Sequence, residues 1–312
     1  MDTILVTGGA GFIGSHVVDQ LVEFGKQVII VDNLSSGKKE QINSSENVTF
    51  YQLDIRDSQL ADVFARYPEI DGVVHLAAQS KVSPSVEDPN FDASININGT
   101  INVLDLARKH GVTHFVYASS AAVYGQTPDL PIVENSPVSP LSPYGVSKLS
   151  GEEYVKAYGR LYQMSVYALR FANVFGPRQS AATEAGVITI FIEQLLNQQQ
   201  PTIQGDGQQT RDFVYVEDVA RAVVACLQAP PSSDGSAVYN VSTCEEVSIE
   251  QLLRELCRIL EIDYDPHYAA ERIGDIKYSY LSNQKIMEQF NLHPQTPFRE
   301  GLQKTVGYYQ KK

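Results

Sequence analysis

Short β-rich segments alternate with longer helical segments along the first two-thirds of this chain, and this alternation limits the possible folds more than any other feature. The expected strands cover residues 4–6, 28–31, 48–52, 72–75, 114–118 and 165–169, and the expected helices cover residues 13–24, 95–109 and 147–162. A strand followed by a helix and then by a second strand forms a βαβ unit, so the pattern predicts a doubly wound parallel sheet of the α/β class.

The last third of the chain is less regular. Residues 176–212 carry many Gly, Gln and Pro residues around one expected helix at 187–196. Strands are expected at 213–216 and 238–241, with a helix at 219–227 between them, and the tail from residue 248 is mostly helical. We therefore expect a smaller C-terminal α/β lobe that caps the sheet, with some of its segments returning to the large domain.

Composition excludes several classes of partner. The 312 residues carry a net charge of −13, which argues against nucleic acid or an anionic membrane as the main ligand. No apolar run approaches the roughly 20 residues of a membrane-spanning helix. Cys226, Cys244 and Cys257 lack metal-binding or redox spacing, so no metal site is expected, and an odd number of thiols suits a reducing compartment. With no leader-like segment before residue 3, we expect a cytoplasmic protein.

A glycine-rich turn follows the first expected strand. Gly8, Gly11 and Gly14 form a G-x-x-G-x-x-G pattern, which lets backbone N–H groups and a helix N-terminus approach a pyrophosphate. Asp32 ends the next expected strand. In dinucleotide-binding folds, the carboxylate that binds the adenosine ribose lies about 20 residues after the glycine turn, which is close to the position of Asp32. Such a carboxylate repels a 2′-phosphate, so the pattern favours NAD over NADP. The alternative is that Asp32 is an ordinary turn residue.

Tyr144 and Lys148 lie one helical turn apart if a helix begins at the Ser-Pro step at residues 142–143. A free tyrosine has a pKa near 10, and lowering this pKa by roughly 3 units requires about 4 kcal/mol. A neighbouring ammonium and a helix N-terminus can supply that energy. The same spacing recurs at Tyr308 and Lys312, so the first pair carries weight only through its neighbours.

The ends of other expected strands supply further candidates, because ligands of such sheets collect outside the carboxyl ends of the strands. Ser120 follows the fifth strand, where its hydroxyl would meet Tyr144; the alternative is a loop serine that bonds its own backbone. Small residues at 76–78 follow the fourth strand and leave room for a cofactor. Asp54 and Ile55 follow the third strand, where they either face an adenine or form a surface turn.

Taken in order, these motifs resemble those of the extended short-chain dehydrogenase/reductase family, and within it the nucleotide-sugar 4-epimerases of the UDP-glucose 4-epimerase type. The similarity covers essentially the whole chain. Besides the glycine turn, it rests on residues 32–37 (DNLSSG), 75–78 (HLAA), 119–125 (SSAAVYG), 144–148 (YGVSK), 170–179 (RFANVFGPRQ) and 211–213 (RDF).

The resemblance implies an organisation and an activity. Residues 1–172 would form an NAD-binding Rossmann domain, with segments near 213–241 returning to it, and residues 173–212 and 242–312 would form a nucleotide-sugar-binding lobe. The implied reaction is NAD-dependent, reversible C4 epimerisation of a UDP-hexose, UDP-glucose or UDP-galactose, through a transient 4-keto sugar. A homodimer is also implied, formed by the helices that follow Phe91 and Gly145.

The resemblance also implies a role for each site residue. Tyr144 would take the proton of the sugar O4, Lys148 would lower the pKa of Tyr144 and bind the nicotinamide ribose, and Ser120 would bind O4. Besides Tyr144 and Lys148, the implied cofactor contacts are Gly8, Gly11, Phe12, Ile13, Gly14, Asp32, Asn33, Ser35, Ser36, Gly37, Asp54, Ile55, Leu76, Ala77, Ala78 and Gln79. The implied substrate contacts are Ser120, Asn173, Val187, Ile203, Gln204, Arg211, Arg272 and Ser279. The two arginines would hold the diphosphate, although each arginine alone, without the motifs, is more typical of a surface ion pair.

Three positions bear on the subfamily. Ala121 and Ala122 stand where dehydratase relatives carry an Asp-Glu pair, and alanine cannot transfer a proton, so 4,6-dehydration is not expected. Ser279 stands where epimerases restricted to glucose and galactose often carry tyrosine. The smaller serine gives the hypothesis that UDP-GlcNAc and UDP-GalNAc are also accepted. Ile95 aligns with a position that is often asparagine, and its contact stays unassigned.

Alternative functions stay open at this point. They are a nucleotide-4-keto-sugar reductase, an epimerase of another nucleotide sugar and, from a different class, a non-catalytic NAD-binding regulator. Net consumption of added NAD(P)H would favour the reductase, and interconversion without a reductant would favour the epimerase. The presence of Ser120, Tyr144 and Lys148 together argues against the regulator.

Overall fold

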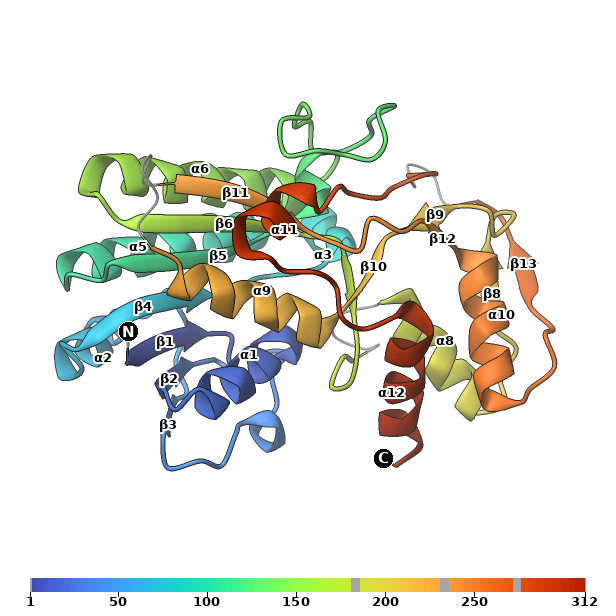
Figure 1. Cartoon of the computed structure of the whole chain (residues 1–312), viewed down its shortest axis with the longest axis horizontal. Helices are drawn as coiled ribbons and strands as arrows, with labels where there is room; N and C mark the ends of the chain where they lie inside the picture. Colours follow the sequence, from blue (N-terminus) through green and yellow to red (C-terminus); the bar gives the residue numbers. More distant parts are fainter. Residues whose placement is uncertain (1, 181–185, 231–235, 272–275, 312) are drawn as a thin grey trace.

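Seven parallel strands form one sheet in the order β11-β6-β5-β4-β1-β2-β3 (Figure 1). The structure, a computed structural model, describes residues 2–180, 186–230, 236–271 and 276–311. The strands are β1 (Thr3–Thr7), β2 (Gln27–Val31), β3 (Val48–Tyr51), β4 (Ile70–His75), β5 (His114–Ser120), β6 (Ser165–Phe171) and β11 (Ser236–Val241). The strand order reverses between β1 and β4, which defines a doubly wound sheet and confirms the predicted fold class.

Helices cover both faces of this sheet. Successive strand side chains point to opposite faces, so Ile4 and Val6 pack in one apolar core and Leu5 packs in the other. The first core is closed by α1 (Phe12–Glu23), α9 (Val216–Gln228) and α11 (Gln284–Phe290). The second is closed by α2 (Leu60–Arg66), α5 (Thr100–Lys109) and α6 (Pro143–Tyr162). Burial on both sides explains the continuous apolar runs of the central strands, such as β1 and β2.

A third apolar core lies beside the sheet, at the right of Figure 1. Its helices are α8 (Val187–Leu196), α10 (Ile249–Leu260) and α12 (Phe298–Gln310). Its strands form three short pairs: β7 (Asn173–Phe175) with β10 (Phe213–Tyr215), β8 (Thr202–Gln204) with β13 (His267–Ala269), and β9 (Thr210–Arg211) with β12 (Val247–Ser248). We call this third core with its surrounding elements the lobe.

Some segments beyond residue 212 belong to the sheet. β11 pairs with β6 at the edge of the sheet, and α11 packs against β11. Ile286 of α11 is part of the same apolar core as Ile4 of β1. The division of the chain at residues 172 and 242 stays a prediction. Helix α11, which that division assigns to the lobe, lies on the sheet.

The chain before α5 differs from the single helix expected at residues 95–109. Two short helices, α3 (Val82–Glu87) and α4 (Pro89–Ala93), lead into a π-helix, η2 (Ser94–Gly99), which runs directly into α5. Asn96 of η2 is buried, at 1% exposure. Single π turns occur frequently at functional sites because they redirect side chains out of the regular helical pattern.

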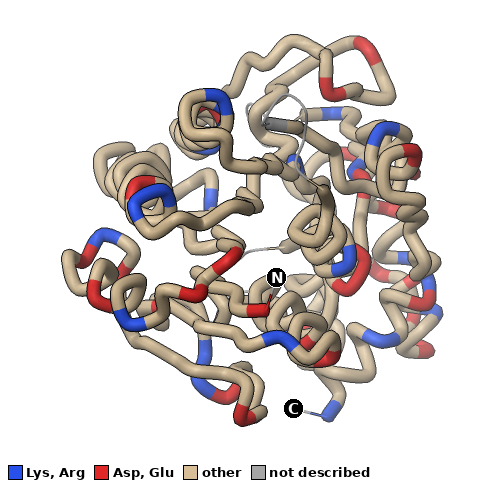
Figure 2. Tube along the Cα trace, turned by 60° about the vertical axis from the view of Figure 1, so that its left-hand side comes forward, with Lys and Arg blue, Asp and Glu red and all other residues tan. Residues whose placement is uncertain are grey.

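The surface agrees with the composition. Figure 2 shows positive and negative residues interspersed along the outer loops and helices. In the part of the chain that the structure describes, no helix combines the length and the apolar character needed to cross a bilayer.

Candidate active site

A cavity of about 240 Å³ opens at the carboxyl ends of the sheet strands. Its wall is built from the segments that follow β1, β2, β3 and β4, together with the end of β5 and the start of α6. The predicted cofactor contacts that line it are Gly8, Gly11, Phe12, Ile13, Gly14, Asp32, Asn33, Ser35, Ser36, Asp54, Ile55, Leu76, Ala77, Ala78, Tyr144 and Lys148. The parallel sheet therefore brings most of the predicted set to one place, and their individual roles stay predictions.

Two predicted cofactor contacts lie outside this wall. Gly37 packs behind it, since a Cβ there would approach the Asp32 Oδ1 atom to 3.0 Å and the Ala10 carbonyl oxygen to 3.0 Å. Gln79 is engaged by its backbone N–H, which donates to the Asn96 Oδ1 atom at 2.9 Å. Both residues shape the wall from behind in this structure.

Sequence reasoning missed several residues of the wall. They are Val31, Leu53, Ser80, Ile95, Ala118, Ser119, Phe171, Val174 and Gln179. Extending the strand-end argument by a residue on each side would have found Val31, Ala118, Ser119 and Phe171. Gln179, which reaches the wall from the lobe side, ends the 170–179 motif but was given no role from sequence. Ile95, left without a contact above, lines the cavity.

The glycine turn is packed against backbone. Gly8 has φ +73°, and a Cβ there would come within 2.8 Å of the Ala77 backbone nitrogen. A Cβ on Gly14 would overlap the carbonyl oxygen of Gly8. Gly11 is the N-cap of α1, so the first turn of this helix faces the cavity without a side-chain cap. This arrangement fits a dinucleotide pyrophosphate, because such an anion needs close access to backbone N–H groups at a helix N-terminus.

Asp32 is held in place by backbone donors. Its Oδ2 atom accepts from the Ala10 N–H at 3.0 Å and its Oδ1 atom from the Leu34 N–H at 2.8 Å. Burial raises the pKa of this carboxyl, and the two hydrogen bonds oppose the rise. Asp32 is thus a fixed carboxylate on the cavity wall, as a partner for ribose hydroxyls requires. The alternative of an ordinary turn residue does not explain why it is 7% exposed and lines the cavity.

The neighbouring carboxylate of Asp54 is fixed in a similar way. The Asn33 side chain donates to it at 2.9 Å, and Arg56 donates to both of its oxygens at 2.8 Å. The hydrogen bonds and charge of Arg56 lower the pKa of Asp54 to about 2. Asn33 and Asp54 therefore present a pre-organised polar edge at the end of the cavity formed by β2 and β3.

Tyr144 stands in the first turn of α6. The helix begins as predicted: Ser142 is the N-cap, its Oγ atom accepts from the Gly145 N–H at 3.2 Å, and Pro143 occupies the first turn. The Tyr144 N–H donates to the Oγ atom of Ser85 on α3 at 3.0 Å. Helix α6 is therefore tied to α3 at the residue that carries the phenol.

The phenol of Tyr144 is hydrogen-bonded to the Ser120 side chain. Burial raises the pKa of Tyr144, the Ser120 hydrogen bond lowers it, and the negative charge of Asp92 raises it further. The Ser120 Oγ atom also accepts from the Ala122 N–H at 3.2 Å. Ser120 therefore does both things that the sequence allowed: its hydroxyl accepts a hydrogen bond from a nearby backbone N–H, and it is hydrogen-bonded to Tyr144.

Lys148 lies one turn farther along α6. Its Nζ atom donates to the Ala118 carbonyl at 2.9 Å and lies 5.3 Å from the centre of the Tyr117 ring. Burial lowers the pKa of Lys148 to about 8. In this structure burial dominates the pKa of Tyr144 and the Lys148 ammonium is directed at the Ala118 carbonyl, so the effect of Lys148 on the phenol stays a prediction.

A buried ion pair supports the strand that carries Ser120. Arg170 on β6 donates to Glu152 on α6, with an Arg170 Nη2 to Glu152 Oε1 distance of 2.6 Å. The Ser119 hydroxyl donates to the other oxygen of Glu152 at 3.0 Å. Because Glu152 and Arg170 are 0% and 4% exposed, this network ties the end of β5 to α6 and β6.

The predicted substrate contacts in the lobe do not reach the cavity wall. Asn173 is exposed on β7, and an Arg211 Nη1 atom donates to the carbonyl oxygen of Ile276 at 2.7 Å. Ile203 is fully buried in the apolar core of the lobe, which weighs against a direct contact with a base. Gln204, Val187 and Ser279 are half-buried, and Arg272 lies outside the described residues.

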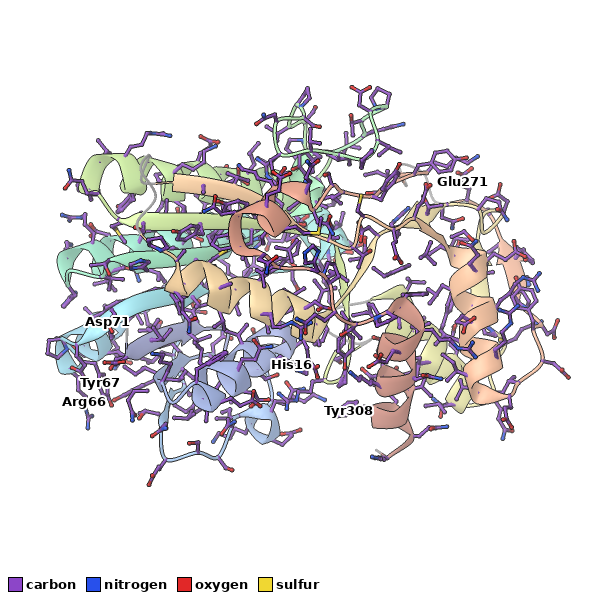
Figure 3. All side chains as sticks on the ribbon, in the orientation of Figure 1. His16, Arg66, Tyr67, Asp71, Glu271 and Tyr308 are labelled. Atoms are coloured by element: carbon purple, nitrogen blue, oxygen red, sulfur yellow. The ribbon has the colours of Figure 1, made fainter. Side chains whose placement is uncertain are left out.

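Contacts between α1 and the segment that enters the lobe set the position of the lobe beside the cavity. The His16 Nε2 atom is 3.0 Å from the Pro177 carbonyl oxygen, and Arg178 pairs with Asp19 at 2.7 Å. His16 on α1 and Tyr308 on α12 mark the two sides of this junction in Figure 3. Burial lowers the pKa of His16, which favours its neutral form.

Comparison with known proteins agrees with this geometry. Residues 4–242 match the NAD-dependent epimerase/dehydratase family. A protein of Methanocaldococcus jannaschii named putative UDP-glucose 4-epimerase is 44% identical over 98% of this chain and 97% of its own length. The crystal structure of UDP-glucose 4-epimerase from Thermotoga maritima with UDP-glucose has a TM-score of 0.94 at 41% identity, covering 99% of both chains. A UDP-N-acetylglucosamine 4-epimerase from Methanobrevibacter ruminantium, in complex with UDP-N-acetylmuramic acid, has a TM-score of 0.93 at 36% identity, covering 99% of this chain and 98% of its own.

Proposed function

This chain belongs to the NAD-dependent epimerase/dehydratase family, and from that premise we propose that it interconverts UDP-glucose and UDP-galactose by oxidising and re-reducing the sugar at C4. The observation that carries the proposal is the Tyr144 phenol, which lies on the wall of the cavity and is hydrogen-bonded to Ser120 behind that wall, with the buried Lys148 one turn farther along α6. The relatives named as UDP-glucose 4-epimerases support the choice of nucleotide sugar.

The residues that would hold the cofactor are already fixed in place. The glycine turn and the N-terminus of α1 would hold the pyrophosphate of NAD, and Asp32 would accept hydrogen bonds from the adenosine ribose. Lys148 would donate to the nicotinamide ribose. When bound there, NAD would supply the hydride acceptor and donor for the sugar C4.

The side chains of the chain supply the matching proton transfer. Tyr144, as phenolate, takes the proton from O4 while C4 loses hydride, and Ser120 binds O4 and passes the proton. The 4-keto sugar then rotates in the site. C4 receives hydride on its other face, and Tyr144 returns the proton to O4. Because burial raises the pKa of Tyr144, forming the phenolate requires nearby positive charge, and Lys148 is the cation on the same helical face.

The loop after Ser120 lacks the acid–base pair that 4,6-dehydration needs. Ala121 and Ala122, just after Ser120, carry no side chain that transfers a proton. Elimination of water across C5–C6 would need such a group. Reversible oxidation at a single carbinol is therefore the chemistry that this set of side chains supports.

A panel of UDP- and TDP-hexoses tests the activity. Each is incubated with the purified protein without added reductant, and the epimers are resolved by chromatography. We expect UDP-glucose and UDP-galactose to equilibrate, and Tyr144→Phe to lose nearly all of this activity while keeping bound NAD. Full activity in Tyr144→Phe would overturn the mechanism. Net consumption of added NAD(P)H would show a reductase instead, and NAD binding without turnover of any sugar would show a regulator.

We propose further that UDP-GlcNAc and UDP-GalNAc are substrates, because Ser279 occupies less volume than the tyrosine of the restricted epimerases. The likeness to a UDP-N-acetylglucosamine 4-epimerase supports this extension. Ser279→Tyr is expected to reduce kcat/KM for the acetamido sugars selectively, and Tyr278→Ser is the control, since Tyr278 is 48% exposed. Equal loss of both activities in Ser279→Tyr would contradict the role of Ser279.

We propose a homodimer formed by the helices that follow Phe91 and Gly145, which are α5 and α6 in this structure, with α3 and α4 beside them. Apolar side chains exposed on α3, α4 and α6 support it: Val82, Val86, Phe91, Val146, Tyr154, Leu161 and Tyr162. Phe91→Glu combined with Tyr154→Glu should shift the mass measured by light scattering from dimer to monomer. Tyr268→Glu changes an equally exposed ring on β13 of the lobe and should leave the mass unchanged.

We also propose a cytoplasmic location. Cys226, Cys244 and Cys257 all lie in the described part of the chain and are free thiols. Free thiols fit a reducing compartment, and fractionation of the native cells with an antibody to the chain would test the proposal.

A further inference from the structure

Asp92 is a buried carboxylate that the mechanism above does not use. It lies on α4 and is 1% exposed. Its Oδ1 atom accepts from the Gln79 side chain at 2.7 Å and from the Asn96 side chain at 3.1 Å. Its Oδ2 atom is buried and has no hydrogen-bond partner among the described residues. A buried carboxylate with one oxygen unpaired is costly unless a nearby positive charge compensates it.

A chain of hydrogen bonds connects this carboxylate to the reactive turn of α6. The Asn96 Nδ2 atom donates to Asp92 and, at 3.0 Å, to the Oγ atom of Ser147. The Ser147 hydroxyl in turn donates to the Tyr144 carbonyl at 3.0 Å. Ser147 directly precedes Lys148, and α4 packs against α6. The π-helix that carries Asn96 therefore fixes Asp92 relative to both reactive side chains.

The ionisable side chains around Lys148 differ in whether they can supply a compensating negative charge. His75 is neutral, because burial and the charge of Lys148 lower its pKa to about 3. Burial keeps the phenols of Tyr117 and Tyr144 protonated, since it raises the pKa of each. Glu152, on the next turn, is paired with Arg170. Among the described residues, Asp92 is thus the acidic group that acts on Lys148 without a cation of its own.

The electrostatics of the two groups agree with this geometry. Lys148 is 5% exposed, and its Nζ atom donates to the neutral carbonyl of Ala118. Burial lowers the pKa of Lys148, and the negative charge of Asp92 is the influence that raises it. Without that charge, a buried ammonium would give up its proton at a lower pH.

We propose that Asp92 is a positioning residue whose carboxylate is the buried counter-charge that keeps the Lys148 ammonium protonated, with the Asn96–Ser147 bridge fixing its place. The inference rests on the proposed function only where turnover is measured. Its direct consequence concerns the proton on Lys148, which can be followed without substrate.

Asp92→Asn tests the proposal, because asparagine keeps the shape and the Oδ1 acceptor while removing the charge. Protein labelled with ¹³Cε-lysine is titrated by NMR, and the signal of Lys148 is identified as the one missing from Lys148→Arg. We expect the midpoint of this signal to fall by about 1 pH unit or more in Asp92→Asn, the effect of removing an opposite charge at close range. In the turnover assay at pH values above the wild-type midpoint of Lys148, the kcat of Asp92→Asn should be about tenfold lower than that of the wild type, with KM unchanged.

Asp88→Asn is the matched control. Asp88 is the exposed N-cap of the same helix, where asparagine is an equally good cap, so it removes the same charge without disturbing the fold. Its Lys148 midpoint should equal that of the wild type, and Asp92→Glu, which keeps the charge, should recover most of the shift. An unchanged midpoint in Asp92→Asn, or an equal fall in Asp88→Asn, would overturn the proposal.

Wild-type protein provides a test that does not depend on the folding of a variant. The proposal needs the charge of Asp92 at neutral pH, so a ¹³Cγ signal that showed a protonated Asp92 carboxyl at pH 7 would overturn it. The outcome is separable from the proposed activity. A shifted midpoint in a protein that turns over no sugar would support the counter-charge and contradict the epimerase.

Discussion

At the scale of single residues, the glycines of the turn between β1 and α1 show how closely the backbone is packed around the cavity. A Cβ on Gly14 would overlap the Gly8 carbonyl oxygen, which cannot move without displacing the turn. We therefore expect Gly14→Ala to lose at least tenfold in NAD affinity, measured by calorimetry on cofactor-stripped protein. The sheet should remain folded, because Gly14 follows β1 and does not pair within the sheet.

Gly307 gives the matched control for that substitution. It lies within α12, and a Cβ there would meet no atom within 4 Å. Alanine stabilises a helix by about 1 kcal/mol relative to glycine, so Gly307→Ala should keep full NAD affinity and unfold at a slightly higher temperature. Equal loss of affinity in both variants would show that the close packing of the turn is not what matters.

At the scale of elements, the N-terminus of α6 connects helix stability to the site. The Ser142 Oγ atom caps this helix two residues before Tyr144, and the capping box of Ser248 and Gln251 does the same for α10 in the lobe. Losing either cap should lower the free energy of unfolding by about 1 kcal/mol, measured by urea titration. Only Ser142→Ala should also lower kcat, because only its helix begins with the reactive phenol. If Ser248→Ala reduced kcat equally, the cap would matter through general stability alone.

Elements with a clear hydrophobic period were predictable, and elements set by tertiary contacts were not. The strands of the sheet were found from sequence because both faces are buried and the apolar runs are continuous, as in β1 and β2. The pairs β8–β13 and β9–β12 have two or three residues per strand, too few to show a period. The π-helix η2 was expected as regular helix, since a π turn leaves no period of its own in the sequence.

The same distinction applies to the site. The glycine turn and Asp32 were found because their spacing is set by a local βαβ unit. The environment of Lys148 was not predictable, because Ala118 and Asp92 come from separate elements that only the fold brings together. For this reason the burial that raises the pKa of Tyr144 was not foreseen: local spacing shows the neighbouring cation but not the depth of burial.

At the scale of the whole molecule, the sheet depends on a histidine that remains neutral. His75 on β4 lies 2.7 Å from the Thr7 hydroxyl of β1 and 3.0 Å from the Thr100 hydroxyl of α5, and its ring stacks on Tyr117. Burial lowers its pKa from 6.5 to about 3. Below pH 6.5 the unfolded chain binds a proton at this position that the folded protein excludes, so stability falls as the pH drops toward 3. Asp212 acts in the opposite direction, because burial raises its pKa to about 6 and the folded state then binds a proton between pH 6 and 3.8.

His75→Gln separates these two contributions. Glutamine can still bond to Thr7 and Thr100 but does not titrate, so the variant should lose stability less steeply than the wild type between pH 6 and pH 4. Each proton excluded by the folded state contributes about 1.4 kcal/mol per pH unit, and the difference between the two curves should approach that slope. Urea unfolding at half-unit pH steps measures it. His267→Gln, at an exposed position on β13, is the control and should follow the wild-type curve. Parallel curves for His75→Gln and the wild type would mean that another buried group, rather than the histidine that joins β1, β4 and α5, sets the acid limit of the fold.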